Sequence, residues 1–327
     1  MPARPASSAE AASPAGLASP PAGAQEAAAD TATLRGRVVR GGDTVPVADR
    51  TVVLHRVEPE GGSPVDSVRT GPEGRFAFRL VPTEGVVHLA SARYDGVLYL
   101  GPAVHGGQLP SEYLVRVWEA RPATPADTVR VRRRTLVLTS EGGALRVMDV
   151  ADVSAGTERT LAPPAGDGSA WWGVRLPAGV RDVRVLPGGV DPSAVEVRGG
   201  EVRASADIPP RGVRLVLGYR LPEGRALALA PGPGTGRLEV VARGVPGELS
   251  VRGLRPAGTS TVQGQEIRRW TAAGDAVDTV RVLVAGGGGA PGGSAAAWIA
   301  LAVGVLAAAG AILAWRAGSA GAGAGGG

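Results

Sequence analysis

Apolar and polar residues alternate along the chain from Thr33 onward, which is the pattern of strands with one buried face. In Arg75–Leu80, for example, Phe76, Phe78 and Leu80 fall on the same side. Turn residues separate these short stretches, and none of them has a helical period. The pattern therefore predicts an all-β sandwich over residues 32–120, with strands at 34–38, 52–54, 75–80, 86–94, 97–100 and 113–118.

A second all-β region is predicted over residues 128–285, as one larger sandwich or two small ones. Two hairpins are expected around the turns Glu141–Gly143 and Arg198–Gly200. Val213–Leu221 has the cleanest alternation in the chain. Further strands are predicted at 226–229, 238–242, 249–251, 266–271 and 279–284.

Four other segments have compositions unlike those of the β-regions. Residues 1–31 are rich in Ala, Pro and Ser and are expected to be disordered, and so is the tail at 317–327. Residues 121–127 are predicted as a linker between the two β-regions, and residues 286–294 as a glycine-rich tether.

Residues 295–316 predict a single transmembrane helix. The run Ala295–Trp315 carries no charge, and as a helix it would span roughly 30 Å, the thickness of a bilayer core. Trp298 and Trp315 lie at its ends, where indoles favour the membrane interface, and Arg316 follows. The predicted partner is a lipid bilayer, with the C-terminus in the cytoplasm and both β-regions on the extracytoplasmic side.

Composition excludes several kinds of chemistry. The net charge is +5, and all 35 basic residues are arginines, interspersed with acidic ones along the chain. There is no lysine for a P-loop or a Schiff base, and no cysteine for a disulfide or a thiolate nucleophile. The basic run Arg130–Arg134 lacks neighbouring aromatics for nucleic-acid binding, so it is interpreted as a solvated or edge strand.

A family resemblance emerges from motifs in residues 32–120. Leu34-x-Gly36-x-Val38, Pro46-Val47, Val52-x-Leu54 and Thr70-x-x-x-Gly74-x-Phe76-x-Phe78 occur in this order. The combination resembles the carboxypeptidase regulatory-like domain, a transthyretin-like or starch-binding-like β-sandwich. The resemblance implies a structural or binding module without catalysis of its own. Gly71 stands where relatives often carry an acidic or Asn residue, which argues against a cation site in this turn.

Histidines are the main candidates for metal or nucleophilic chemistry. His55 and Glu58 match the His-x-x-Glu of metallocarboxypeptidases, but their spacing on a strand sends them to opposite faces. His88 alternates with Ala90 and Ala92 and is predicted to pack inside the sandwich, and only His105 remains. No Gly-x-Ser-x-Gly nucleophile motif occurs. The prediction is a protein that is not an enzyme and has no metal or cofactor.

Four aromatic residues are candidates for a ligand or partner surface: Trp171, Trp172, Tyr94 and Tyr99. Adjacent strand residues face opposite ways, so one of the paired tryptophans is expected in the core and the other outside. An exposed indole can stack on a sugar ring or anchor a partner protein. The alternative is that both indoles cover one end of the sandwich.

Together these features predict a non-catalytic, membrane-anchored, extracytoplasmic binding or assembly module of a bacterial-type cell envelope. Its partners would be envelope proteins or polysaccharide, and not nucleic acid, and its oligomeric state is left open. A carbohydrate-binding surface module is one alternative. A zinc-dependent hydrolase built on His55 and Glu58 is the other.

Overall fold

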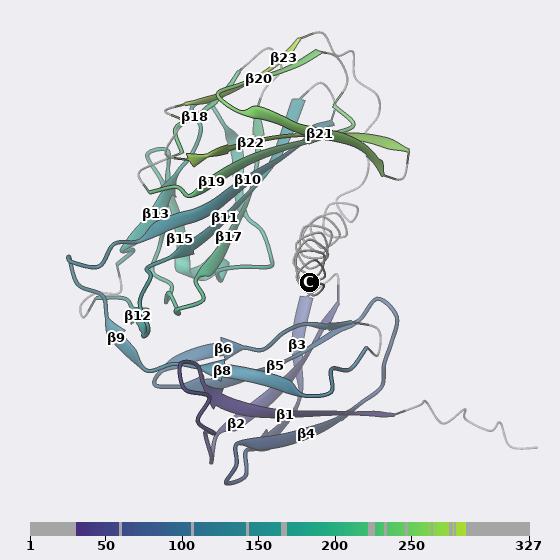
Figure 1. Ribbon diagram of the computed structural model, residues 1–327, viewed down its shortest axis with the longest axis vertical. Coiled ribbons are helices and arrows are strands. Elements are labelled where there is room, and N and C mark those ends of the chain that lie inside the picture. Colours follow the sequence, from purple (N-terminus) through teal and green to yellow (C-terminus); the bar gives the residue numbers. More distant parts are fainter. Residues whose placement is uncertain are drawn as a thin grey trace, which may run out of the picture.

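The computed structural model describes residues 31–285, with gaps at 59–60, 106–107, 142–143, 165–168, 222–225, 232–233, 246–247, 263, 275–276 and 278. These residues form two β-lobes (Figure 1). They contain no α-helix, and none of their elements is a helix long and apolar enough to cross a membrane. Residues 1–30, the tether at 286–294, the predicted span at 295–316 and the tail at 317–327 lie outside the described residues.

The first lobe is a two-layer β-sandwich, as predicted. One sheet has the order β4-β1-β8, with β8 parallel to β1, and the other has the order β3-β2-β5-β6, with β7 also pairing with β5. The strands are β1 (Ala32–Arg40), β2 (Thr51–Glu58), β3 (Gly61–Arg69), β4 (Arg75–Leu80), β5 (Val87–Tyr94), β6 (Val97–Leu100), β7 (Val104–His105) and β8 (Tyr113–Val117).

Alternation in the sequence translates directly into the core of this lobe. Phe76, Phe78 and Leu80 of β4 are buried while the residues between them are exposed. Gly36 of β1 pairs with Phe76, and a Cβ at this position would lie 2.4 Å from the Tyr113 carbonyl oxygen and 2.6 Å from the Phe76 ring. The glycine of the Leu34-x-Gly36-x-Val38 motif is therefore required for close packing of the aromatic rings.

The second lobe is built on one seven-stranded sheet with the order β14-β17-β11-β10-β19-β22-β21. Two three-stranded sheets, β13-β16-β15 and β18-β23-β20, accompany it. The strands are β10 (Arg130–Glu141), β11 (Ala144–Ser154), β13 (Trp172–Arg175), β14 (Arg181–Val185), β15 (Val195–Arg198), β16 (Glu201–Ala204), β17 (Val213–Leu221), β18 (Leu227–Leu229), β19 (Arg237–Arg243), β20 (Glu248–Arg252), β21 (Arg255–Val262), β22 (Gln265–Ala273) and β23 (Val280–Ala285), with a 3₁₀ turn at Pro192–Ala194. Both predicted hairpins, β10-β11 and β15-β16, are present.

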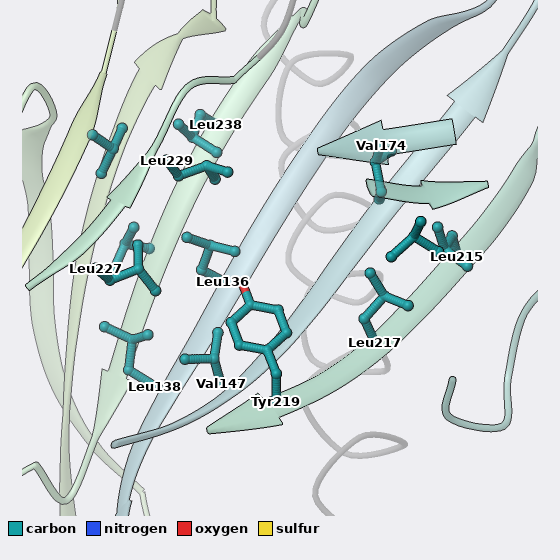
Figure 2. Close-up of a cluster of buried hydrophobic side chains, with 14 of the residues drawn as sticks. Leu136, Leu138, Val147, Val174, Leu215, Leu217, Tyr219, Leu227, Leu229 and Leu238 are labelled. Atoms are coloured by element: carbon teal, nitrogen blue, oxygen red, sulfur yellow. The ribbon is translucent and has the colours of Figure 1, made fainter. Parts of the chain in front are cut away.

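The seven-stranded sheet has buried side chains on both of its faces. One face joins the main core of the lobe, where Leu136, Val147, Leu217 and Tyr219 converge with leucines of β18 and β19 (Figure 2). The opposite face carries a separate buried cluster: Val137, Met148, Val150, Val216, Val241 and Ile267. Both Leu217 and its neighbour Val216 are buried, a pattern that strands with one solvent face do not show.

A hydrogen-bonded junction connects the lobes. β9 (Ala120–Pro122) runs parallel to β12 (Thr160–Ala162) at this point (Figure 1). The Tyr99 hydroxyl donates to the Trp118 carbonyl oxygen at 2.7 Å and lies 2.7 Å from the Thr160 hydroxyl. The segment predicted as a linker, residues 121–127, begins within β9, and Arg121 of that strand forms an ion pair of 2.6 Å with Asp127.

Two expectations about strands need correction. The run Arg130–Arg134 begins the central strand β10 and not an edge strand; Arg130 and Arg132 are exposed, but Arg134 is 1 % exposed. The edge strands β3 and β21 were not predicted. They contain Pro64 and Pro256, and their described side chains are almost all exposed, so they lack the alternation that marks a half-buried strand.

Candidate functional site

A cleft of about 790 Å³ lies in the second lobe beside β13 and β16. Its lining includes the indole of Trp171, four arginines and two carboxylates: Arg130, Arg134, Arg175, Arg203, Asp127 and Glu201. Both predicted ligand-surface tryptophans, Trp171 and Trp172, line this cleft. An aromatic face beside a few charged groups is the usual composition of a small-ligand site.

Trp171 and Trp172 differ in burial, although both line the cleft and both pack against the main core. Trp172 is 5 % exposed, packs in the main core and donates its Nε1–H to the Ala206 carbonyl oxygen at 2.9 Å. Trp171 is only partly buried. Its Nε1 is buried and has no hydrogen-bond partner among the described residues. Trp171 therefore keeps part of its surface accessible to a ligand, whereas Trp172 is a core residue.

A buried ion pair forms part of the cleft wall. Arg134 binds Asp149 through two hydrogen bonds, of 2.9 and 2.6 Å, and also donates to the Arg175 carbonyl oxygen at 2.9 Å. The Tyr219 hydroxyl donates to Asp149 at 3.0 Å. Burial alone would lower the pKa of Arg134, but the charge and hydrogen bonds of Asp149 raise it. Burial also raises the pKa of Tyr219 well above its ordinary value. Arg134 therefore stays a cation, and Tyr219 stays a neutral hydrogen-bond donor.

The charges at the cleft surface are partly compensated. Arg175 and Glu201 pair across β13 and β16 at 3.4 Å. The carboxylate of Asp127 is held by Arg121, whose hydrogen bond lowers the pKa of Asp127 well below its usual range. Arg203 donates to the Ala170 carbonyl oxygen at 3.2 Å, and Arg130 is exposed. The cleft surface therefore carries an excess of positive charge beside the Trp171 ring.

The tyrosines of the first lobe do not form a comparable surface. Tyr94 and Val97 flank the two-residue turn Asp95–Gly96, where both φ angles are positive, as in a type I′ hairpin. The Arg50 guanidinium lies 5.5 Å above the Tyr94 ring. Tyr99 is 4 % exposed, and its hydroxyl belongs to the junction between the lobes. Of the four predicted aromatics, Trp171 and Tyr94 remain partly accessible, and Tyr99 and Trp172 are buried.

The histidines of the first lobe are separated by the geometry of its sheet. His55 lies 2.8 Å from the Ser91 hydroxyl, and Glu58 pairs with Arg56 at 2.7 Å. His88 is 7 % exposed, as predicted for a packed histidine. Burial lowers the pKa of both His55 and His88, and Arg56 contributes to the shift of His88. No group of three His, Asp or Glu side chains among the described residues is placed to hold a metal ion.

No protein-family model matches the chain, and no curated protein matches it. The resemblance of residues 32–120 to carboxypeptidase regulatory-like domains is therefore not confirmed as family membership. The predicted membrane anchor residues Trp298, Trp315 and Arg316 lie outside the described part of the chain.

Solved structures show distant similarity. An M1 zinc metallopeptidase from Deinococcus radiodurans is 14 % identical, with a TM-score of 0.30; the match covers 48 % of this chain and 42 % of that chain, so less than half of the metallopeptidase is spanned. The full-length major pilin SpaD from Corynebacterium diphtheriae is 13 % identical over 77 % of this chain and 82 % of its own, with a TM-score of 0.22. The major pilin subunit BcpA of Bacillus cereus is 9 % identical over 77 % and 84 %, with a TM-score of 0.19. The chain is an all-β, multi-sheet protein with distant structural similarity to pilins and M1 peptidases and without a family assignment.

Proposed function

We propose that this protein is a non-catalytic, two-lobed binding or assembly module that is held at the extracytoplasmic face of a cell envelope by a membrane helix at residues 295–316. The first lobe would be a carboxypeptidase regulatory-like sandwich, and the second lobe would present the Trp171 cleft. The observation that carries the proposal is the junction between the lobes, where buried hydrogen bonds join residues of both.

Hydrogen bonds at the junction support a fixed arrangement of the lobes. Thr160 is fully buried, and its hydroxyl donates to Tyr99, since the single proton of Tyr99 is given to the Trp118 carbonyl. The Thr160 N–H donates to the Glu119 carbonyl at 2.9 Å, and the Ala120 N–H donates to Asp95 at 2.7 Å. Domains joined by small polar interfaces move relative to one another by default. Buried, directional hydrogen bonds from both lobes oppose such motion.

A distance measurement between the lobes tests the rigidity. The chain contains no native cysteine, so Val65→Cys on β3 and Val262→Cys on β21 can carry two spin labels at exposed positions. A narrow distance distribution is expected, comparable with that of a control pair within the first lobe, Val65→Cys with Leu100→Cys. A broad distribution between the lobes, with a narrow one in the control, would refute a fixed two-lobed module.

Sidedness tests the localisation separately. Ser260→Cys lies on β21, where the described side chains are exposed. Labelling of intact cells with a membrane-impermeant maleimide is expected if the lobes are extracytoplasmic. Labelling only after lysis would place them in the cytoplasm and would overturn the envelope role, while the rigidity result would still stand.

Carbohydrate binding is a second candidate function, favoured by the partly exposed Trp171 ring beside a cleft with excess positive charge. A sugar carrying a carboxylate or phosphate would stack on the indole and pair with Arg130 or Arg203. Trp171→Ala should abolish retention on columns of acidic polysaccharide, and Tyr94→Ala in the other lobe should leave it unchanged. Equal retention by both variants would exclude the cleft as the binding site.

A further inference from the structure

The outer face of the seven-stranded sheet, opposite the core in Figure 2, carries a continuous apolar patch. Val137 of β10 is paired with Met148 of β11 on one side and with Val241 of β19 on the other. Val150 of β11 is paired in the same way with Val216 of β17. Because cross-strand partners point to the same face, these side chains form adjoining rows across the centre of the sheet. We call this surface the outer patch.

The outer patch is almost inaccessible to water. Val137, Met148 and Val216 are 1, 2 and 1 % exposed. A sheet face that is open to solvent leaves its central side chains partly exposed, so such low values require a covering layer. Among the described hydrophobic residues outside the patch, only Leu186, next to the end of β14, packs against it. One leucine at the edge cannot cover a surface that extends over several strands.

The chemistry of the surroundings restricts what the covering layer can be. On one side of the patch, Arg133 and Arg214 both pair with Asp152, at 3.0 and 2.8 Å. On the other side, Arg146 and Arg220 are cross-strand partners. A charged segment would have to bury its own charges on the valines and the methionine between these rows. An uncharged, apolar segment can cover the patch without burying a charge.

We propose that the apolar segment Ala295–Trp315 of the same chain packs across the outer patch whenever it is not inserted in a bilayer. It is the long uncharged apolar run of the chain, and it lies outside the described residues. The inference rests on the membrane anchor of the proposed function, because it gives that anchor a second location. When the chain is not in a bilayer, this one contact removes the apolar surfaces of both the anchor segment and the sheet face from water.

The dimensions allow this contact. The last described strand, β23, ends at Ala285 in the same lobe, and residues 286–294 follow as the predicted tether. Nine extended residues reach at most about 30 Å. A helix of 21 residues is roughly 30 Å long and about 10 Å wide. The patch crosses the five strands from β17 to β22, which at about 4.8 Å between strands is roughly 20 Å. A single helix can therefore cover it.

Crosslinking in the full-length chain tests the proposal. Met148→Cys is combined with Gly304→Cys, at the middle of the apolar segment, and the protein is treated in aqueous buffer with a short bismaleimide. An intramolecular crosslink is expected, seen as a crosslinked monomer by mass spectrometry. The matched control pairs Gly304→Cys with Val197→Cys, which is exposed on β15 of the same lobe. Its yield should be about tenfold lower, because the tether gives that pair a lower effective concentration.

The same protein is then mixed with phosphatidylcholine vesicles, and flotation and crosslinking are measured together. Flotation with loss of the crosslink supports exchange of the segment between the patch and the bilayer. Flotation without any crosslink in buffer overturns the docking proposal and leaves the anchor intact. A crosslink without flotation supports docking and refutes the anchor. Crosslinks between two chains, or equal yields from the Met148→Cys and Val197→Cys pairs, overturn the docking proposal.

Discussion

The two lobes solve the same packing problem in different ways. The first lobe places its core between two sheets, each with one apolar and one polar face, and its largest fully buried side chains, Phe78, Tyr113, Leu34 and Leu54, carry no charge. The second lobe buries both faces of its central sheet and places an ion pair, Arg134 with Asp149, inside it. A sheet that is covered on both faces buries more apolar surface, but every polar group that it encloses needs a hydrogen-bond partner.

This difference determines where each lobe is most vulnerable. In the first lobe a substitution removes apolar contacts and leaves a cavity. In the second lobe a substitution can also leave a buried charge without its partner, which costs more than the missing contact. The predictions below test this contrast, from the largest expected effect to the smallest.

Arg134→Met should produce the largest loss of stability. It leaves the Asp149 carboxylate buried, with Tyr219 as its one remaining donor in the described part of the chain, and breaking such a pair typically costs about 3–5 kcal/mol. Urea denaturation followed by near-ultraviolet circular dichroism measures the change. The double variant Arg134→Met with Asp149→Leu should recover much of the loss, because no unpaired charge remains. A double variant as unstable as the sum of both single variants would contradict this account.

Leu54→Ala in the first lobe should cost slightly less, about 2–4 kcal/mol, as a cavity in an apolar core. Leu54 is 1 % exposed and contacts no buried charge in its cluster. The stability lost in Leu54→Ala cannot be recovered by substituting a partner residue, in contrast to the stability lost in Arg134→Met. In the same denaturation experiment Leu98→Ala, at a half-exposed position on β6, should change the free energy of unfolding by less than about 0.5 kcal/mol.

Tyr99→Phe probes the contact between the lobes and should cost about 1–2 kcal/mol. It removes a hydroxyl that bonds to both the Trp118 carbonyl and Thr160 while keeping the ring in the core. Tyr94→Phe is the matched control, because that ring lies at the surface beneath Arg50. The separation between the unfolding transitions of the two lobes should widen in Tyr99→Phe alone. Identical unfolding curves for the two variants would show that the hydroxyl does not couple the lobes.

Sequence alternation predicted the first lobe well because most of its strands bury one face. It worked less well at the ends of each sheet: β3 and β21 are exposed on both faces and contain prolines, so they carry no period of two. It also failed at Arg134, since an arginine within a basic run indicates a solvated strand until its partner, Asp149 on β11, is known. That partner is fixed by the strand register, which the sequence does not display.

The candidate site shows the same division. A difference in burial between Trp171 and Trp172 was predicted from strand geometry, but which of them is more buried was not, and both pack against the main core. The cleft itself could not be predicted, because its walls come from residues as far apart as Asp127, Trp171 and Pro231. Tyr99 was a surface candidate by its sequence, but its ring packs in the core of the first lobe and its hydroxyl contacts Thr160 of the other lobe.

The smallest effect is a pH dependence confined to the first lobe. All three histidines, His55, His88 and His105, lie there. Burial lowers the pKa of His55 and His88 in the folded chain, so below about pH 6.5 the unfolded chain binds protons that the folded chain does not. The free energy of unfolding of this lobe should therefore fall as the pH is lowered from 7.5 to 5.5, and His88→Gln should reduce that slope.

The second lobe has no histidine, so its acid sensitivity comes from carboxylates such as Asp152. Burial alone would raise the pKa of Asp152, but Arg214 and Arg133 lower it. The second lobe should therefore lose stability only below about pH 4. Urea midpoints for each lobe at several pH values measure both windows, and a second lobe that loses stability between pH 7.5 and 5.5 would show that the two lobes unfold as one unit.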